Sequence, residues 1–475
     1  MRKALIAMVV LLVLSAAGLT WMNVDVNAAR DQVVMTESVA RGDTSVVEGL
    51  AVDVYAHYND QLFWDTTFTL GAEPQADTEY EFYQFKHTPE VPPSYTGLRL
   101  ETAISYGIDW NANSGLNVAY NELYDSLKPG EEATKVIWLK DYYEYYPITA
   151  ELSVPWSRQR GANYYPEDDP EPGTYYYVIA KLNELIKIPM LEEECVEISI
   201  SLSASGSSSS MGWGHSMEGT DAYYVGGQSV FNDEAVYFTF SARTEQGKLV
   251  DLSQLKEGYG IYRIPRVEVD EEEKSKYVGL DADRMEMVYE LDPEWEMEWF
   301  ELDPLDESHL RMITRLKSEN TFVFTLIDLN TMETLQEFTL AEPEKEEWWF
   351  IQDEGEFIVM CLRNETAVVL VRDEEGHFSI DLTAPLADDS ILSDWYDIDK
   401  MDMDYKDGRL AVVDTMRDEI WYSYESCGVK VLVLDETGEI FYGEYTSSLS
   451  KGDLADNYYD RCIPLDYDPL TIRWE

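Results

Sequence analysis

Aspartates crowd one short window of the chain, and their carboxylates are the groups that a calcium ion would use. The window holds six of them, at Asp394, Asp397, Asp399, Asp402, Asp404 and Asp407. Calcium takes about six to eight oxygen ligands, so Asp397, Asp399, Asp402 and Asp404 are candidate metal ligands. The D-x-[DN]-x-[DN]-G loop is not met, because Lys406 and Asp407 move Gly408 out of register. We therefore favour a solvated acidic strand face, with calcium as the alternative.

Two further groups of residues could bind a ligand. Trp213 and His215 stand in the run "MGWGHSMEG", where an indole face could stack on a ligand and an imidazole could donate a hydrogen bond. Arg158 and Arg160 could hold an anion in this acidic chain. An ordinary surface loop is the favoured interpretation of the first group. Ion pairing with residues 167–169 is the favoured interpretation of the second.

Carbohydrate chemistry is suggested only by composition. Tyrosine pairs such as Tyr142-Tyr143 and Tyr164-Tyr165 could form a sugar platform, although aromatic residues packing between sheets explain them as well. Glycoside hydrolysis needs paired carboxylates, and 93 acidic residues make some pairs inevitable. The sequence contains no serine nucleophile elbow, phosphate-binding glycine loop or HExxH motif. A non-enzymatic protein is favoured and an enzyme stays open.

Charge and cysteine content limit the partners. The formal net charge of −58 repels phosphate backbones, so we expect no nucleic acid partner. None of the four cysteines has CxxC spacing, which gives no indication of a zinc or redox site. Cys361 lies in an apolar run and suits a buried thiol, whereas Cys427 and Cys462 could pair if the fold brings them together.

The N-terminus has the pattern of an export signal. Arg2 and Lys3 precede an apolar run from Ala4 to Leu19, and residues 26–28 offer a small-residue cleavage site. The run approaches the ~20 residues that span a bilayer, and Trp21 suits an interface. We expect residues 1–22 to be a signal peptide or membrane anchor, residues 23–45 a tether and the bulk extracytoplasmic. An uncleaved anchor in the cell membrane is favoured, and secretion after cleavage near Ala28 is the alternative.

Strands dominate the remainder. Residues 46–58 and 61–70 flank a turn at Asn59-Asp60 and predict a hairpin. The other expected elements are a strand at 78–85, short helices at 118–127 and 181–188, and loops at 155–173 and 203–214.

Some strands lack the alternation of apolar and polar residues that one wet face requires. Phe357–Leu362 and Ala367–Val371 are apolar throughout, and turns at 373–376, 407–408 and 435–438 separate such runs. In a β-propeller each antiparallel sheet is sandwiched between two neighbours, so its inner strands are dry on both faces. The sequence predicts an all-β fold: a propeller-like array of about 7–8 irregular four-stranded blades. We expect less regular blades over 46–230 and more regular ones over 231–475.

This pattern resembles uncharacterised exported, membrane-anchored β-propeller-like proteins of Gram-positive bacteria. The residues that carry the resemblance are the N-terminal segment, Val46–Thr69, Leu185–Ile200 and Gly258–Pro265. The resemblance implies a fold and a location but no activity. We expect a membrane-anchored binding or interaction protein for an extracytoplasmic ligand or envelope protein, and a propeller enzyme acting on glycans is the alternative.

Overall fold

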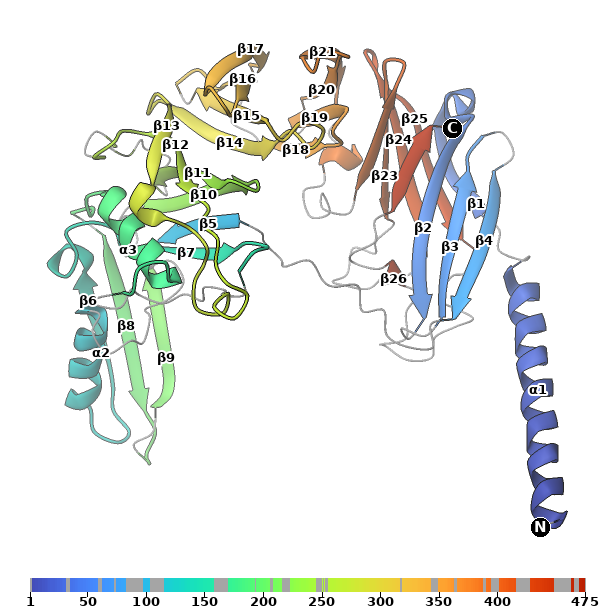
Figure 1. The fold of residues 1–475 in the computed structure, drawn as a ribbon, viewed down its shortest axis with the longest axis horizontal. Helices are drawn as coiled ribbons and strands as arrows, with labels where there is room; N and C mark the ends of the chain where they lie inside the picture. The colour runs from blue at the N-terminus through green and yellow to red at the C-terminus, as the bar shows by residue number, and fades with distance from the viewer. Residues whose placement is uncertain are drawn as a thin grey trace. The chain divides into compact units, whose positions relative to one another are not determined.

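The computed structural model forms two compact units (Figure 1). Unit 1 is Met1–Val91 with Lys345–Glu475, and unit 2 is Pro92–Glu344. The structure describes residues 2–30, 35–58, 62–71, 74–82, 97–102, 115–157, 170–192, 194–205, 208–215, 223–244, 250, 252, 255–316, 318–342, 349–362, 365–387, 390–393, 401–415, 428–447, 463–464 and 470–474.

The described residues of unit 1 form three antiparallel sheets. Their orders are β18-β19-β20-β21, β1-β25-β24-β23-β22 and β26-β2-β3-β4, with β27 paired to β2. The elements of unit 1 are α1 (Arg2–Arg30), β1 (Met35–Gly42), η1 (Thr44–Val47), β2 (Leu50–Tyr58), β3 (Leu62–Thr69), β4 (Gln75–Phe82), β18 (Trp349–Asp353), β19 (Phe357–Leu362), β20 (Thr366–Arg372), β21 (Phe378–Pro385), η4 (Ile391–Ser393), β22 (Asp402–Lys406), β23 (Arg409–Thr415), β24 (Gly428–Asp435), β25 (Gly438–Ser447), β26 (Ile463–Pro464) and β27 (Thr471–Trp474).

The middle strands β19 and β23 of unit 1 are dry on both faces, as the missing alternation predicts. Every residue of β19 is buried. In β23, Leu410 and Val412 join one apolar cluster with residues of β19 and β20. Ala411 and Val413, on the opposite face of β23, join a second cluster with residues of β2. The β22–β25 sheet therefore packs between the two other sheets of unit 1.

The two ends of the chain complete each other's sheets in unit 1. The N-terminal strand β1 pairs with β25, and the C-terminal strand β27 pairs with β2. Strand β1 falls inside the segment expected to be a tether. The side chains of residues 36–42 are exposed, so the strand carries no apolar pattern there, and the backbone of β25 provides the pairing instead.

Acidic turn residues form the hairpins at the predicted places. Asp407 and Gly408 both have positive φ, 53° and 75°, which is the conformation of a two-residue type I′ hairpin turn. The Asp373 carboxylate accepts hydrogen bonds from the amides of Glu375 and His377, each at 2.9 Å. The hairpin of β2 and β3 is confirmed on either side of residues 59–61.

In the part of unit 2 that the structure describes, the strands also form three antiparallel sheets. Their orders are β13-β12-β11-β10-β5-β7, β14-β15-β16-β17 and β6-β8-β9. The elements of unit 2 are β5 (Gly97–Thr102), α2 (Gly115–Ser126), β6 (Glu132–Trp138), η2 (Leu139–Asp141), β7 (Ile148–Ser153), α3 (Tyr175–Leu185), β8 (Cys195–Leu202), β9 (Ser208–His215), β10 (Tyr223–Phe231), β11 (Ala235–Thr244), β12 (Gly260–Pro265), η3 (Ala282–Arg284), β13 (Glu286–Glu290), β14 (Trp295–Leu302), β15 (His309–Leu316), β16 (Thr321–Asp328) and β17 (Glu333–Ala341).

Helix α3 covers part of the unit 2 core. Thr174 caps its first turn by accepting a hydrogen bond from the Tyr177 amide, and its apolar stripe is buried at Val178, Ile179 and Leu182. The helix begins before the expected residue 181, because the aromatic run "YYY" joins its first turn. Helix α2 confirms the helix expected at 118–127.

The fold is all-β with several antiparallel four-stranded sheets, which confirms the coarse prediction. Among the described strands, no sheet closes on itself. Within the part of the chain that the structure describes, no helix combines the length and the apolar character needed to cross a membrane.

Leu432 tests the sandwiched position of the β22–β25 sheet. Its side chain is fully buried in β24. We expect Leu432→Ala to lower the free energy of unfolding of unit 1 by about 2–5 kcal/mol, because a cavity opens between two packed sheets. Ile380→Ala, at a residue of β21 that is 41% exposed, is the control and should change stability by less than about 0.5 kcal/mol. Equal effects of the two substitutions in urea unfolding would contradict the sandwich.

Candidate functional site

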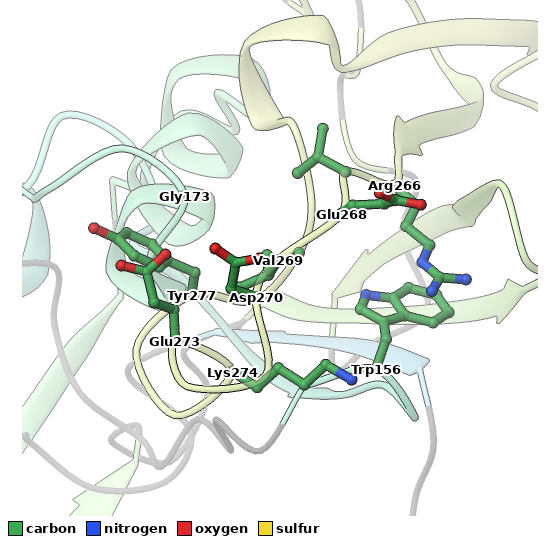
Figure 2. Close-up of a pocket in the computed structure, with 11 residues that line it drawn as sticks. Trp156, Gly173, Arg266, Glu268, Val269, Asp270, Glu273, Lys274 and Tyr277 are labelled. Carbon is green, nitrogen blue, oxygen red and sulfur yellow. The ribbon is translucent and has the colours of Figure 1, made fainter.

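A hollow of about 610 Å³ lies in unit 2 beside Trp156 (Figure 2). We call it the Trp156 hollow. Its lining includes Trp156, Arg266, Asp270, Lys274 and Tyr277. The side chains come from the segment after β7 and from the loop that follows β12.

That loop, residues 267–279, is a strap tied down at both ends. At its base Arg266 pairs with Leu280 in a β-bridge, and the Val267 amide donates to the Gly279 carbonyl at 2.9 Å. Near its tip the Ser157 hydroxyl lies 3.3 Å from the Lys274 carbonyl and 3.1 Å from the Tyr277 carbonyl. Backbone groups therefore hold the strap in place, which gives the hollow a preformed wall.

Trp156 is the apolar anchor of this site. It is 8% exposed, its indole N–H donates to the Val278 carbonyl at 3.1 Å, and its ring meets Phe231 edge-on. Figure 2 shows the Arg266 guanidinium over the indole, 4.7 Å from the ring centroid. Gly279 has φ of +72°, and a Cβ there would lie 2.7 Å from the Trp156 ring. Only glycine fits this close approach.

A charged clasp fixes the outer side of the strap. The Lys276 ammonium lies 2.7 Å from the Glu171 carboxylate, and the Tyr277 hydroxyl donates to the same carboxylate at 2.7 Å. The hydrogen bonds from Lys276 and Tyr277 lower the pKa of Glu171. The pair is exposed and contributes orientation more than stability.

The lining chemistry suits a small polar ligand. Arg266 and Lys274 offer donors, whereas Glu268, Asp270 and Glu273 offer carboxylate acceptors. Pockets of about 300–1,000 Å³ with a few placed polar groups are typical of small-molecule sites. Among the described residues, no group of three or more His, Cys, Asp or Glu side chains could hold a metal ion.

The structure places Trp213 and His215 in a strand and not in the loop expected over residues 203–214. Both belong to β9, opposite Ile198 and Val196 of β8. The serine- and glycine-rich composition predicts a loop, but backbone pairing with β8 makes the strand. Arg158 and Arg160 lie outside the described residues, so anion binding there stays a prediction.

Two of the predicted calcium ligands hold the C-terminal strand. The carboxylates of Asp402 and Asp404 each accept a hydrogen bond, from the amides of Ile472 and Trp474, both at 2.6 Å. These amides belong to β27, whose other edge pairs with β2. Asp397 and Asp399 lie outside the described residues, so calcium binding there stays a prediction.

The buried carboxylates of β14 form ion pairs. Glu296 and Glu298 both meet the Arg315 guanidinium, at 3.2 and 2.5 Å, and all three side chains are 8–10% exposed. Breaking such a buried pair leaves an uncompensated charge, so this triad has a clear structural role.

No sequence motif identifies the residues of the Trp156 hollow. The composition of residues 155–173 predicts only a loop around Trp156, and no motif distinguishes Arg266 or Lys274. A weak signal existed in the two lysines that interrupt the acidic run "EVDEEEKSKY". The meeting of residues 156 and 266 is tertiary and has no local signature.

Comparison with known proteins gives little guidance. No protein-family model matches the chain, and no curated protein matches it. One solved structure with some similarity is an auxiliary nutrient binding protein from Bacteroides thetaiotaomicron, at 9% identity and a TM-score of 0.20. The match covers 54% of this chain and 83% of that one. A TM-score this low supports no conclusion about fold or function.

The carboxylate that holds β27 predicts a pH effect on stability. Burial raises the pKa of Asp402, and this effect is larger than the lowering of the pKa by the hydrogen bond from the Ile472 amide. A raised pKa means that the folded state binds the proton more tightly, so this contribution to stability is lost as the pH rises through the folded pKa. We expect Asp402→Asn to be more stable than the parent at pH 7, with the difference vanishing at acidic pH.

Asp373 is the matched contrast in the same unit. The hydrogen bond from the His377 amide lowers its pKa, so its contribution is present at neutral pH and lost as the pH falls through the folded pKa. Asp373→Asn should therefore be less stable than the parent at pH 7 and equal to it in acid. Thermal unfolding from pH 3 to 7 measures both variants. The same sign of change for both at pH 7 would contradict the assignment.

Proposed function

We propose that this chain is an extracytoplasmic, membrane-anchored binding protein whose ligand site is the Trp156 hollow. The observation that carries the proposal is the hollow itself, about 610 Å³ and walled by a strap tied down at both ends. A rigid wall reduces the ordering cost of binding. The mixed acidic and basic lining favours a polar molecule with hydroxyl, amine or acid groups.

A glycan-active enzyme is the second candidate. Asp270 and Glu273 line the same hollow and could act as paired carboxylates on a sugar. Binding is favoured because the hollow needs no reacting group to hold a ligand, whereas hydrolysis needs two carboxylates at a defined separation. Turnover of any glycan by the purified protein would favour the enzyme.

The scaffold belongs to the proposal as well. We infer a propeller-like array of about 7–8 blades. Support comes from the four-stranded meanders β14–β17 and β18–β21 and from the sandwiched β22–β25 sheet. The pairing of β1 with β25 and of β27 with β2 also fits blades that are completed by strands from both ends of the chain.

The proposed location is supported by the N-terminal segment. Arg2 and Lys3 precede the apolar run, and the apolar side chains of α1 that the structure describes are exposed, Leu11 by 65% and Trp21 by 69%. Exposed apolar surface of this kind favours insertion into a bilayer or removal as a signal peptide. We favour the uncleaved anchor. Partners are then extracytoplasmic ligands or envelope proteins, with nucleic acid disfavoured by charge.

Ligand binding is tested with a panel of sugars, amino acids and short peptides. Thermal shift identifies a binder and calorimetry measures its affinity. Lys274→Ala and Asp270→Asn should each weaken binding about tenfold, because each removes a polar contact to the ligand. Lys256→Ala, at an exposed lysine of unit 2 outside the hollow, is the matched control.

The proposal fails if no panel member binds. It also fails if a binder loses equal affinity in Lys274→Ala and Lys256→Ala, because the site would then lie elsewhere.

The anchor is tested by N-terminal sequencing of protein recovered from an exporting cell. We expect the segment before Ala28 to be retained and the protein to be in the membrane fraction, because the apolar run is long enough to stay in the bilayer. A new terminus at Ala29 in the medium would contradict the anchor and favour secretion.

A further inference from the structure

A second hollow, about 650 Å³, adjoins the first in unit 2. Three arginines line it, Arg263, Arg266 and Arg284, and we call it the Arg hollow. Arg266 and Glu268 line both hollows and form the wall between them. One ligand that spans this wall would contact both.

The charge balance of the Arg hollow differs from that of the chain. Its three arginines face Asp233, Glu234 and Glu268, so bases and acids are equal in number. The whole chain has 35 basic and 93 acidic residues. The lining of the Arg hollow is thus neutral on a strongly acidic protein, so an anion meets less repulsion there than over the acidic surface.

The guanidinium groups have weak existing partners. Arg266 lies 3.4 Å from the carboxylate of Asp233, whose side chain is 99% exposed, and Arg263 lies 3.7 Å from Glu286. In the described part of the chain, Arg284 has no carboxylate within ion-pair distance. Arg266 also donates to the Asp233 carbonyl at 3.1 Å. The carboxylates of Asp233 and Glu286 are exposed, and pairs with exposed carboxylates contribute little, so an incoming oxyanion would displace these two carboxylates at small cost.

Rigid elements present these side chains. Arg263 lies in β12, paired with Tyr237 of β11 and Glu286 of β13. Arg284 ends the short helix η3, and the backbone of Arg266 donates to the Glu234 carbonyl at 2.7 Å. The stack on Trp156 orients the plane of the Arg266 guanidinium, which is the group best suited to grip an oxyanion with two parallel hydrogen bonds.

We propose that the Arg hollow binds an oxyanion group, carboxylate or phosphate, of the ligand whose body occupies the Trp156 hollow. The inference rests on the proposed binding function and narrows its ligand to an acidic small molecule. Arg266 is the basic residue that the two hollows share, and it would face the anion on one side while it covers the indole on the other.

The test uses the full chain with two probes, inorganic phosphate and acetate, titrated against chloride at equal ionic strength. Calorimetry and the ³¹P line width of phosphate report binding. Arg284→Gln and Arg263→Gln should each weaken the preferred anion about tenfold, since each removes a charge-assisted hydrogen bond. Lys256→Gln removes the same charge from unit 2 outside both hollows and should leave affinity unchanged.

Each outcome decides between the two proposals. Tighter binding of acetate assigns a carboxylate ligand, and tighter binding of phosphate assigns a phosphate ligand. If neither anion binds more tightly than chloride, or if Arg284→Gln and Lys256→Gln behave alike, the Arg hollow is not an anion site. Neutral panel ligands that still depend on Lys274 would then preserve the proposed function. Arginine-dependent anion binding without any panel ligand would instead overturn the Trp156 hollow as a ligand site.

Discussion

A β-strand that is apolar on both faces needs a packed neighbour on each side, and this requirement determines how the sheets of unit 1 are stacked. The β22–β25 sheet meets it by burying Leu410 and Val412 in one cluster and Ala411 and Val413 in another. The ends of the chain add strands to two of these three sheets, because β1 pairs with β25 in the β22–β25 sheet and β27 pairs with β2 in a flanking sheet. Asp402 and Asp404 then bind the free edge of β27, so part of the acidic window satisfies backbone amides that a short edge strand would leave exposed.

The strands of unit 2 also pack in sheets, but this unit buries charged groups and carries a long connection between strands. Its β14 carries a buried ionic triad around Arg315, and its six-stranded sheet supports the strap that follows β12. Stacked sheets leave little freedom to their strands, so variation is left to the connections between them. The strap is such a connection. Arg266, at its base, stacks on Trp156, which is 110 residues away in sequence, and lies between the Trp156 hollow and the Arg hollow.

Local sequence rules explain much of the fold and almost none of the site. The unbroken apolar run Phe357–Leu362 predicts a strand buried on both faces, because an apolar side chain at each position indicates burial at that position. Asp407-Gly408 predicts a tight turn, because the backbone angles of a turn depend on the residues in the turn itself. Strand β9 could not be predicted from the sequence, because serine and glycine have a weak preference for strands. Its strand conformation comes from pairing with β8. The role of Trp156 in the hollow could not be predicted either, because its partners Val278 and Arg266 are distant in the chain. A contact between distant residues leaves no periodic pattern in the sequence.

The stacking of sheets in unit 1 is tested most directly by hydrogen exchange measured on the intact protein. Amides of Val431–Leu434 in the middle of the β22–β25 sheet should exchange only through unfolding of the whole unit, whereas amides of the edge strand β4 should exchange faster through local opening. Exchange of Val431–Leu434 as fast as that of β4 would show that the second face of the sheet is open to water, and the arrangement described here would be wrong.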